Sequence, residues 1–226
     1  MAFRRTLERW HEPDCDIAVV AVTQPHSEKA VAQGNLTGIG FCIMFVMLSV
    51  MLSTGVILEE RVTGTWQRLL ATPARRAEIV LGYLVGFFVS GWLQMGILVL
   101  ATHYLFGLSW GDPLGFFILT SVFIATATAI GLALAGIVRT PQQQSVAANI
   151  GVVVTSMVAG VYWPYEMMPA FMQRIGLFMP QYWALRGYTD LLARGRNLAA
   201  LGRPLLVMAV VCAALLLFGV SRIRFE

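Results

Sequence analysis

Few side chains in this sequence could carry out chemistry, and their spacing argues against most kinds of it. The long apolar segments contain hydroxyl and amide groups, but no histidine or carboxylate accompanies them: Ser90, Gln94, Ser121, Thr126, Thr128 and Asn149. Nucleophilic or acid–base catalysis needs such a partner as its base. Hydroxyl groups in apolar helices usually bond back to their own helix. An enzyme that works within a membrane is therefore the least favoured interpretation.

The motifs that bind nucleotides and metals are missing from the sequence. It has no G-x-x-x-x-G-K-[ST] motif, and its only lysine, Lys29, stands in Glu28-Lys29-Ala30. The cysteines lack C-x-x-C spacing and the histidines are isolated, which disfavours a disulfide framework and a zinc site; these residues are Cys15, Cys42, Cys212, His11, His26 and His103. We expect no catalytic residue, cofactor or metal here, so any transport must draw its energy from another chain.

The composition places the chain in a membrane. Hydrophobic residues make up 58% of its 226 residues and charged residues 12%, and the mean hydropathy is +0.71. A soluble domain of this length cannot hide so much apolar surface, whereas a lipid-facing one need not. The net charge of +4 comes mainly from arginines between apolar runs, where they are typical of residues that flank membrane spans.

Five apolar runs are long enough to cross a hydrocarbon core of about 30 Å as helices. They are Leu36–Leu58, Ile79–Thr102, Leu114–Val138, Ser145–Trp163 and Pro204–Val220. The sequence therefore predicts an all-α, polytopic membrane bundle over residues 36–226, preceded by an external N-terminal segment, residues 1–35.

Small residues four positions apart predict close helix packing in two of the spans. Gly82 and Gly86 have this spacing in the second span, and Gly131 and Ala135 have it in the third. Such pairs let two backbones approach closely in lipid. The alternative is that glycine is simply common in membrane helices.

Arginines in the short connections predict the orientation. They lie between the first and second spans, after the third span and after the fifth: Arg61, Arg68, Arg75, Arg76, Arg139, Arg222 and Arg224. The loop His103–Pro113 has none. The positive-inside rule then places these three basic segments in the cytoplasm, although residues 164–203, external by this scheme, also carry arginines.

This external segment, residues 164–203, has the features of short helices interrupted by proline. Pro164, Pro169 and Pro180 divide it, and apolar residues recur at helical spacing between them. We expect amphipathic helices that dip into the outer interface, with Trp163, Tyr165, Tyr182 and Trp183 at headgroup level. An aromatic belt alone would explain the same residues.

The loop from Glu59 to Pro73 is the most informative stretch. Val62, Trp66, Leu69 and Leu70 are spaced to form one apolar stripe on a helix, and Thr72-Pro73 would end it. Such a helix between two spans can lie on the membrane surface or bind in a groove of a partner. The residue pattern leaves both interpretations open.

The pattern Glu-Arg-x-x-Gly-Thr-x-x-x-Leu-x-x-Thr-Pro, from Glu60 to Pro73, resembles the signature of the type-2 ABC transporter permease family. As in that family, it follows an apolar span. Further similarities precede the last span: Gly160, Trp163-Pro164, Met168-Pro169, Met179-Pro180 and Leu192-x-x-Gly195. The resemblance extends from Asn35 to the C-terminus.

The resemblance implies a permease whose first cytoplasmic loop binds a separate ATP-binding subunit, with a second permease chain, identical or related, completing the pathway. Glu60, Arg61, Gly64 and Thr65 would set the charge and turn of this loop. The loop would pack between the ATPase and the membrane through Trp66, Leu69 and Leu70, and Thr72-Pro73 would fix its return. ATP would be hydrolysed on the partner, and the chain would reside in a bacterial inner membrane.

The family also implies six spans, often with a large external domain after the first. Here five spans are predicted, with 35 residues before them, and Asp16–Thr23 would be a short strand at the end of such a domain. We expect either a shortened relative or a chain whose start lies further upstream. The pathway suits an exported substrate that is hydrophobic, drug-like or lipid-like. The alternative is a membrane scaffold that does not transport.

Overall fold

The computed structural model describes residues 25–71, 75–107, 110–163, 165–192 and 201–222. The chain divides into two compact units, Met1–Gly34 and Asn35–Glu226. In the first unit only residues 25–34 are described, and they are helical. The strand expected at Asp16–Thr23 lies outside the described residues.

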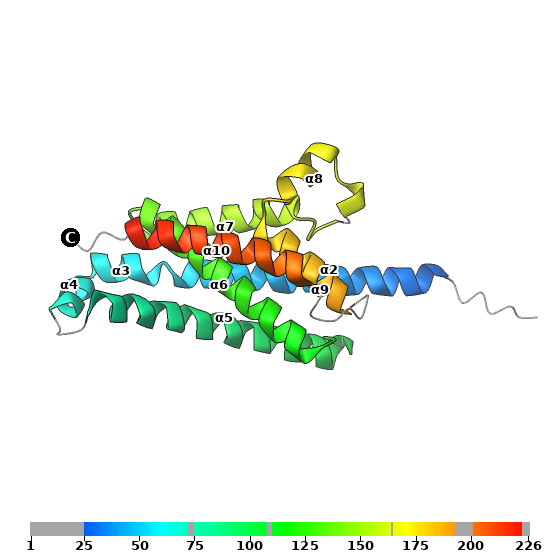
Figure 1. Ribbon diagram of the computed structural model, residues 1–226, viewed down its shortest axis with the longest axis horizontal. Coiled ribbons are helices and arrows are strands. Elements are labelled where there is room, and N and C mark those ends of the chain that lie inside the picture. The colour runs from blue at the N-terminus through cyan, green and yellow to red at the C-terminus, as the bar shows by residue number, and fades with distance from the viewer. Residues whose placement is uncertain (1–24, 72–74, 108–109, 164, 193–200, 223–226) are drawn as a thin grey trace, which may run out of the picture. The chain divides into compact units, whose positions relative to one another are not determined.

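The described residues are mostly helical (Figure 1). This confirms the expected all-α, polytopic bundle. The helices are α2 (Pro25–Ser53), α3 (Val56–Val62), α4 (Thr65–Leu70), α5 (Arg76–Phe106), α6 (Pro113–Ile137), α7 (Pro141–Val158), the 3-10 helix η2 (Tyr165–Met167), α8 (Ala170–Gly176), α9 (Pro180–Leu192) and α10 (Gly202–Arg222).

Three helical stretches in the described part of the chain are long and apolar enough to cross a membrane: Thr37–Val62, Glu78–Leu105 and Pro113–Ile137. They coincide with the first three predicted spans. The fifth predicted span falls in α10, whose apolar part is the shorter stretch Gly202–Leu217. The total of five spans stays a prediction.

The fourth predicted span has different limits in the structure. Its helix, α7, begins at Pro141 rather than Ser145 and ends at Val158 rather than Trp163. Proline at the first helical position and a side-chain cap explain the early start, since Thr140 Oγ1 accepts a hydrogen bond from the Gln143 N–H at 3.2 Å. At the other end Gly160 has φ +85°, which ends the helical path.

Helix α6 lies at the centre of the second unit. It packs against α5, α7, α9 and α10, most extensively against α10. Two buried threonines add polar contacts to this packing. Thr126 Oγ1 donates to the carbonyl of Val122 and contacts that of Met208 in α10 at 3.2 Å, while Thr120 Oγ1 lies 2.6 Å from the Tyr188 hydroxyl in α9.

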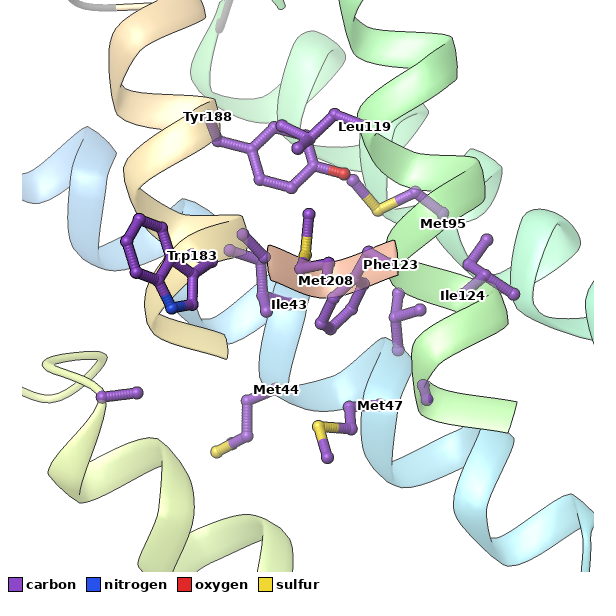
Figure 2. Close-up of a cluster of buried hydrophobic side chains, with 14 of the residues drawn as sticks. Ile43, Met44, Met47, Met95, Leu119, Phe123, Ile124, Trp183, Tyr188 and Met208 are labelled. Atoms are coloured by element: carbon purple, nitrogen blue, oxygen red, sulfur yellow. The ribbon is translucent and has the colours of Figure 1, made fainter. Parts of the chain in front are cut away.

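The main core lies between α2, α6, α9 and α10, and it is rich in methionine. Ile43 of α2, Phe123 of α6 and Met208 of α10 meet there, with Trp183 and Tyr188 of α9 beside them (Figure 2). Methionine side chains are flexible enough to fill the irregular gaps between crossing helices. This core fixes the helices that lead into the loops at both ends of the bundle.

One end of the second unit gathers the segments that carry the loop motif and other arginines. In Figure 1, α3, α4, the turn between α6 and α7 and the carboxyl end of α10 all lie toward the left. The carboxyl end of α5, the start of α6 and helix α8 lie toward the right. Helix α4 and the turn between α6 and α7, two of the basic segments, therefore lie at the same end of the bundle.

Candidate coupling loop

The segment with the family signature forms two short helices rather than one. Helix α3 ends at Val62, Thr63 follows it as the C-cap, and Gly64 has φ +77°. Glycine adopts this left-handed geometry without the clash that a Cβ atom brings. The expectation of one continuous helix from Val62 to Leu70 is therefore wrong, because the helical path is interrupted at Thr63 and Gly64. Val62 is 71% exposed.

Hydroxyl groups hold the turn between the two helices. The Thr63 hydroxyl donates to the Glu59 carbonyl at 3.0 Å, and the Thr63 N–H bonds the same carbonyl at 2.9 Å. The hydroxyl groups of Thr63 and Thr65 lie 3.2 Å apart. The Thr63 hydroxyl thus bonds carbonyls at the end of α3, where the helix leaves backbone groups open, and Thr65 contacts that hydroxyl in turn. The turn is therefore a defined structure with few ways to rearrange.

Both ends of the loop are joined to α5. The Tyr83 hydroxyl donates a hydrogen bond to the carboxylate of Glu60, which connects α3 to the second span. The Glu78 carboxylate accepts a hydrogen bond from the Arg75 N–H at 2.9 Å and caps the start of α5. A movement of α3 would consequently displace α5 or break the hydrogen bond between them.

The remaining residues of the signature are placed as follows. Arg61 and Leu69 are partly buried, and Thr65 and Arg68 are exposed. Trp66 and Leu70 are residues of helix α4. Thr72 and Pro73 lie outside the described residues. Within the described chain, no three His, Cys, Asp or Glu side chains are grouped to hold a metal ion.

The two pairs of small residues differ in what surrounds them. A Cβ atom on Gly131 would lie 2.7 Å from Thr54 Oγ1, so α6 and α2 do approach closely there, and Ala135 is buried. Gly82 and Gly86 are exposed, and a Cβ atom on either would meet nothing within 4 Å. The expectation that this pair packs against another helix is thus wrong for the described chain.

The proline-rich segment is helical where it was expected to be, but it is not all at the surface. Pro169 caps α8 and Pro180 begins α9, while Pro164 lies outside the described residues. Exposed apolar side chains gather on and beside α8: Met167, Phe171, Ile175, Leu177 and Phe178. Tyr182 and Trp183 are instead buried in the main core, so their placement at headgroup level is wrong.

Sequence reasoning missed three residues that position the loop. They are Tyr83, Gln144 and Thr54: Tyr83 bonds Glu60 across two helices, and Gln144 of α7 bonds Thr54, which lies between α2 and α3, at 2.9 Å. The run Pro141-Gln-Gln-Gln144 kept the predicted fourth span from starting before Ser145. The Thr140-Pro141 pair, a typical helix start, is the signal that would have placed Gln144 in the helix.

Comparison with known proteins agrees with the loop motif. The model of the ABC-2 type transporter family matches residues 17–192. The linearmycin resistance permease protein LnrN of Bacillus subtilis is 45% identical over 86% of this chain and 51% of its own length. The probable multidrug ABC transporter permease YbhS of Escherichia coli K12 is 22% identical over 86% of this chain and 52% of its own.

A eukaryotic relative, ABC transporter G family member 20 of Dictyostelium discoideum, is 21% identical over 70% of this chain and 22% of its own length.

The chain spans about half the length of the two bacterial relatives. The family model covers well over half of the chain and includes the loop with its two short helices. This membrane protein belongs to the ABC-2 type transporter family.

Proposed function

We propose that this chain is the membrane-spanning permease subunit of an ATP-driven exporter, powered by a separate ATP-binding subunit. Two bacterial relatives carry the word permease in their names. The observation that carries the proposal is the loop α3–α4. It presents exposed residues at one end of the bundle while Glu60 and Tyr83 join it to the spans. A partner that binds and moves this loop would therefore also move the spans to which the loop is joined.

The partner would bind the exposed side of this loop. Glu59, Val62, Thr65 and Arg68 are exposed there, and they combine both charges with an apolar group. Protein interfaces commonly use such a mixture of an apolar centre and a polar rim. By the positive-inside rule this end faces the cytoplasm, where ATP is available, and the membrane is the bacterial inner membrane.

A second permease chain, identical or related, would complete the pathway. Helix α5 supports this part of the proposal because its surface is largely uncovered. Only 17% of its most apolar stretch is buried, against 56% in the first span and 61% in the third. Lipid covers such a helix in a single chain, and a second chain would replace some of that lipid.

The substrate would be hydrophobic and either drug-like or lipid-like. Most of the buried polar groups are uncharged hydroxyls and amides, such as Thr128, Ser156 and Gln181, with the carboxyl group of Asp190 in α9 as the exception. The hydroxyls and amides can bond a polar atom of an amphipathic molecule but do not select a charge. The names of the relatives refer to linearmycin resistance and to multidrug transport, so antibiotics are the first substrates to test.

The test is co-purification of the tagged full-length chain from its own host. We expect it to retain a protein that carries the G-x-x-x-x-G-K-[ST] motif. Trp66→Glu in α4 should release this protein, whereas Tyr104→Glu should not, because Tyr104 is 81% exposed near the opposite end of α5. If the wild-type chain retains no such protein, the permease proposal fails and the scaffold alternative gains support.

Export is tested separately in cells. Deletion of the gene should increase sensitivity to linearmycin or to another amphipathic antibiotic, and the wild-type gene should restore resistance. Trp66→Glu should fail to restore it, while Tyr104→Glu should restore it. If the deleted strain resists every compound of such a panel as well as the wild-type strain does, this substrate class is contradicted. The binding of an ATP-binding subunit is judged by the co-purification test alone.

A further inference from the structure

The first span is interrupted immediately before the coupling loop. Helix α2 ends at Ser53 and α3 begins at Val56. In a continuous α-helix the Gly55 N–H would bond the carbonyl of Met51, but here it bonds that of Leu52 at 3.0 Å. Backbone groups inside a membrane must find partners within the protein. The Met51 carbonyl consequently needs a donor from elsewhere.

Side chains of Thr54 and Gln144 provide this donor. The Thr54 hydroxyl donates to the Met51 carbonyl at 2.7 Å. Gln144 Nε2, from α7, contacts the same carbonyl at 3.2 Å, Thr54 Oγ1 at 2.9 Å and the Gly131 carbonyl of α6 at 3.3 Å. We call these four residues, Met51, Thr54, Gly131 and Gln144, the polar junction. It joins α6 and α7 to the break between α2 and α3.

The polar junction is closed to solvent and tightly packed. Thr54 and Gln144 are both 0% exposed. A Cβ atom on Gly131 would lie 2.7 and 2.8 Å from two atoms of Thr54, and one on Gly55 would lie 3.4 Å from Cγ of Gln144. The close approach of Gly131 to Thr54 leaves no room for a larger residue, and packed contacts of this kind favour a change between discrete arrangements over a gradual shift.

One atom of the junction is left without a partner. Gln144 Oε1 is buried and has no hydrogen-bond partner among the described residues. A buried acceptor without a donor raises the free energy of the state that contains it. An arrangement that opened the junction could satisfy this oxygen. The closed state is therefore held by the Nε2 contacts and opposed by the Oε1 group, which is suitable for an element with two states.

We propose that the Gln144 amide is a positioning residue that holds α6 and α7 against the break in the first span, and that its contacts open and close during transport. The inference rests on the proposed function, because it needs the α3–α4 loop to be moved by a partner. It adds the path by which movement of the loop would reach the other helices: from α3, across the break at Thr54, to α6 and α7.

Two substitutions at Thr54 test the hydrogen bonds separately from the packing. Thr54→Val keeps the shape but removes the hydroxyl, which is both the acceptor for Gln144 and the donor to Met51. Thr54→Ser keeps the hydroxyl and loses a methyl group. In the assembled complex we expect Thr54→Val to lower export per ATP hydrolysed by about tenfold, and Thr54→Ser to stay close to wild type.

Gln144→Leu provides a second variant, with Gln142→Leu as its control because Gln142 is exposed on the same helix. Gln144→Leu should retain the ATP-binding subunit and hydrolyse ATP but export as poorly as Thr54→Val. Equal export by Thr54→Val and wild type, or lower export by Thr54→Ser than by Thr54→Val, would overturn the inference. A wild-type chain that retains no ATP-binding subunit would instead contradict the proposed function itself.

Discussion

The hydroxyl of Tyr83 in α5 donates a hydrogen bond to the carboxylate of Glu60 in α3. Glu60 lies at the start of the coupling loop, and Tyr83 lies beyond its end, on the second span. Glu60 is also part of the family signature, whereas Tyr83 is not. The bond shows that a residue of the loop motif has a partner on the second span.

Tyr83→Phe should weaken the attachment of the loop without changing its surface. A hydrogen bond to a charged group contributes about 1.5–3 kcal/mol when buried, and partial exposure reduces that to about 1 kcal/mol. We expect a lower melting temperature for the purified chain and weaker export. Tyr104→Phe, exposed on the same helix, is the control and should change neither. Unchanged stability in Tyr83→Phe would show that this bond does not hold the loop.

Gly64→Ala should destabilise the turn between α3 and α4 through the backbone alone. A Cβ atom at Gly64 would meet nothing within 4 Å, but φ is +77°, which costs a residue other than glycine about 1–2 kcal/mol. Gly64→Asn should be better tolerated, since asparagine enters this region more readily. Thermal unfolding and retention of the ATP-binding subunit measure both effects. An alanine variant as stable as wild type would mean that the turn readily changes its geometry.

Gly131→Ala should lower the stability of the chain and Gly86→Ala should leave it unchanged, although each glycine stands four positions from another small residue. At Gly131 the added methyl group would collide with Thr54, and overpacking of this kind costs about 1–3 kcal/mol. At Gly86 there is open space, and alanine favours a helix. Thermal unfolding of the two purified variants checks the difference. A destabilised Gly86→Ala would reveal a neighbour that covers α5 in the assembled protein.

The orientation of the bundle can be read from cysteine labelling. In a chain whose three cysteines are replaced by serine, Arg68→Cys should react with a membrane-impermeant thiol reagent only after the cells are opened. Tyr104→Cys should react in intact cells, because it lies at the other end of α5. The opposite pattern would contradict the assignment of the basic loops to the cytoplasm.

Several features were predictable because they depend on local composition or spacing. Apolar runs located the first three spans to within a few residues, and the signature from Glu60 to Pro73 located the loop. The prolines at 169 and 180 correctly marked the starts of α8 and α9. These signals are local because a lipid environment demands long apolar helices, and proline restricts the backbone wherever it occurs.

Other features depend on which neighbour a helix meets, and the sequence carries little of that information. Gly82 and Gly131 have the same spacing to a small residue, but only Gly131 faces another helix closely. Trp183 looks like an interface residue by type and is buried in the core. The turn at Gly64 was not predicted because the spacing of apolar residues indicated a single helix, although glycine itself permits the turn that occurs.

In the proposed complex, the ATP-binding subunit contacts this membrane protein at the α3–α4 loop. A photoreactive amino acid placed at Arg68, which is exposed in α4, tests it directly in the assembled complex, with the same group at Tyr104 as control. We predict a covalent product between the chain and the ATP-binding subunit from position 68 and none from position 104. A complex that stays assembled but cross-links only from position 104, or from neither position, would contradict the account.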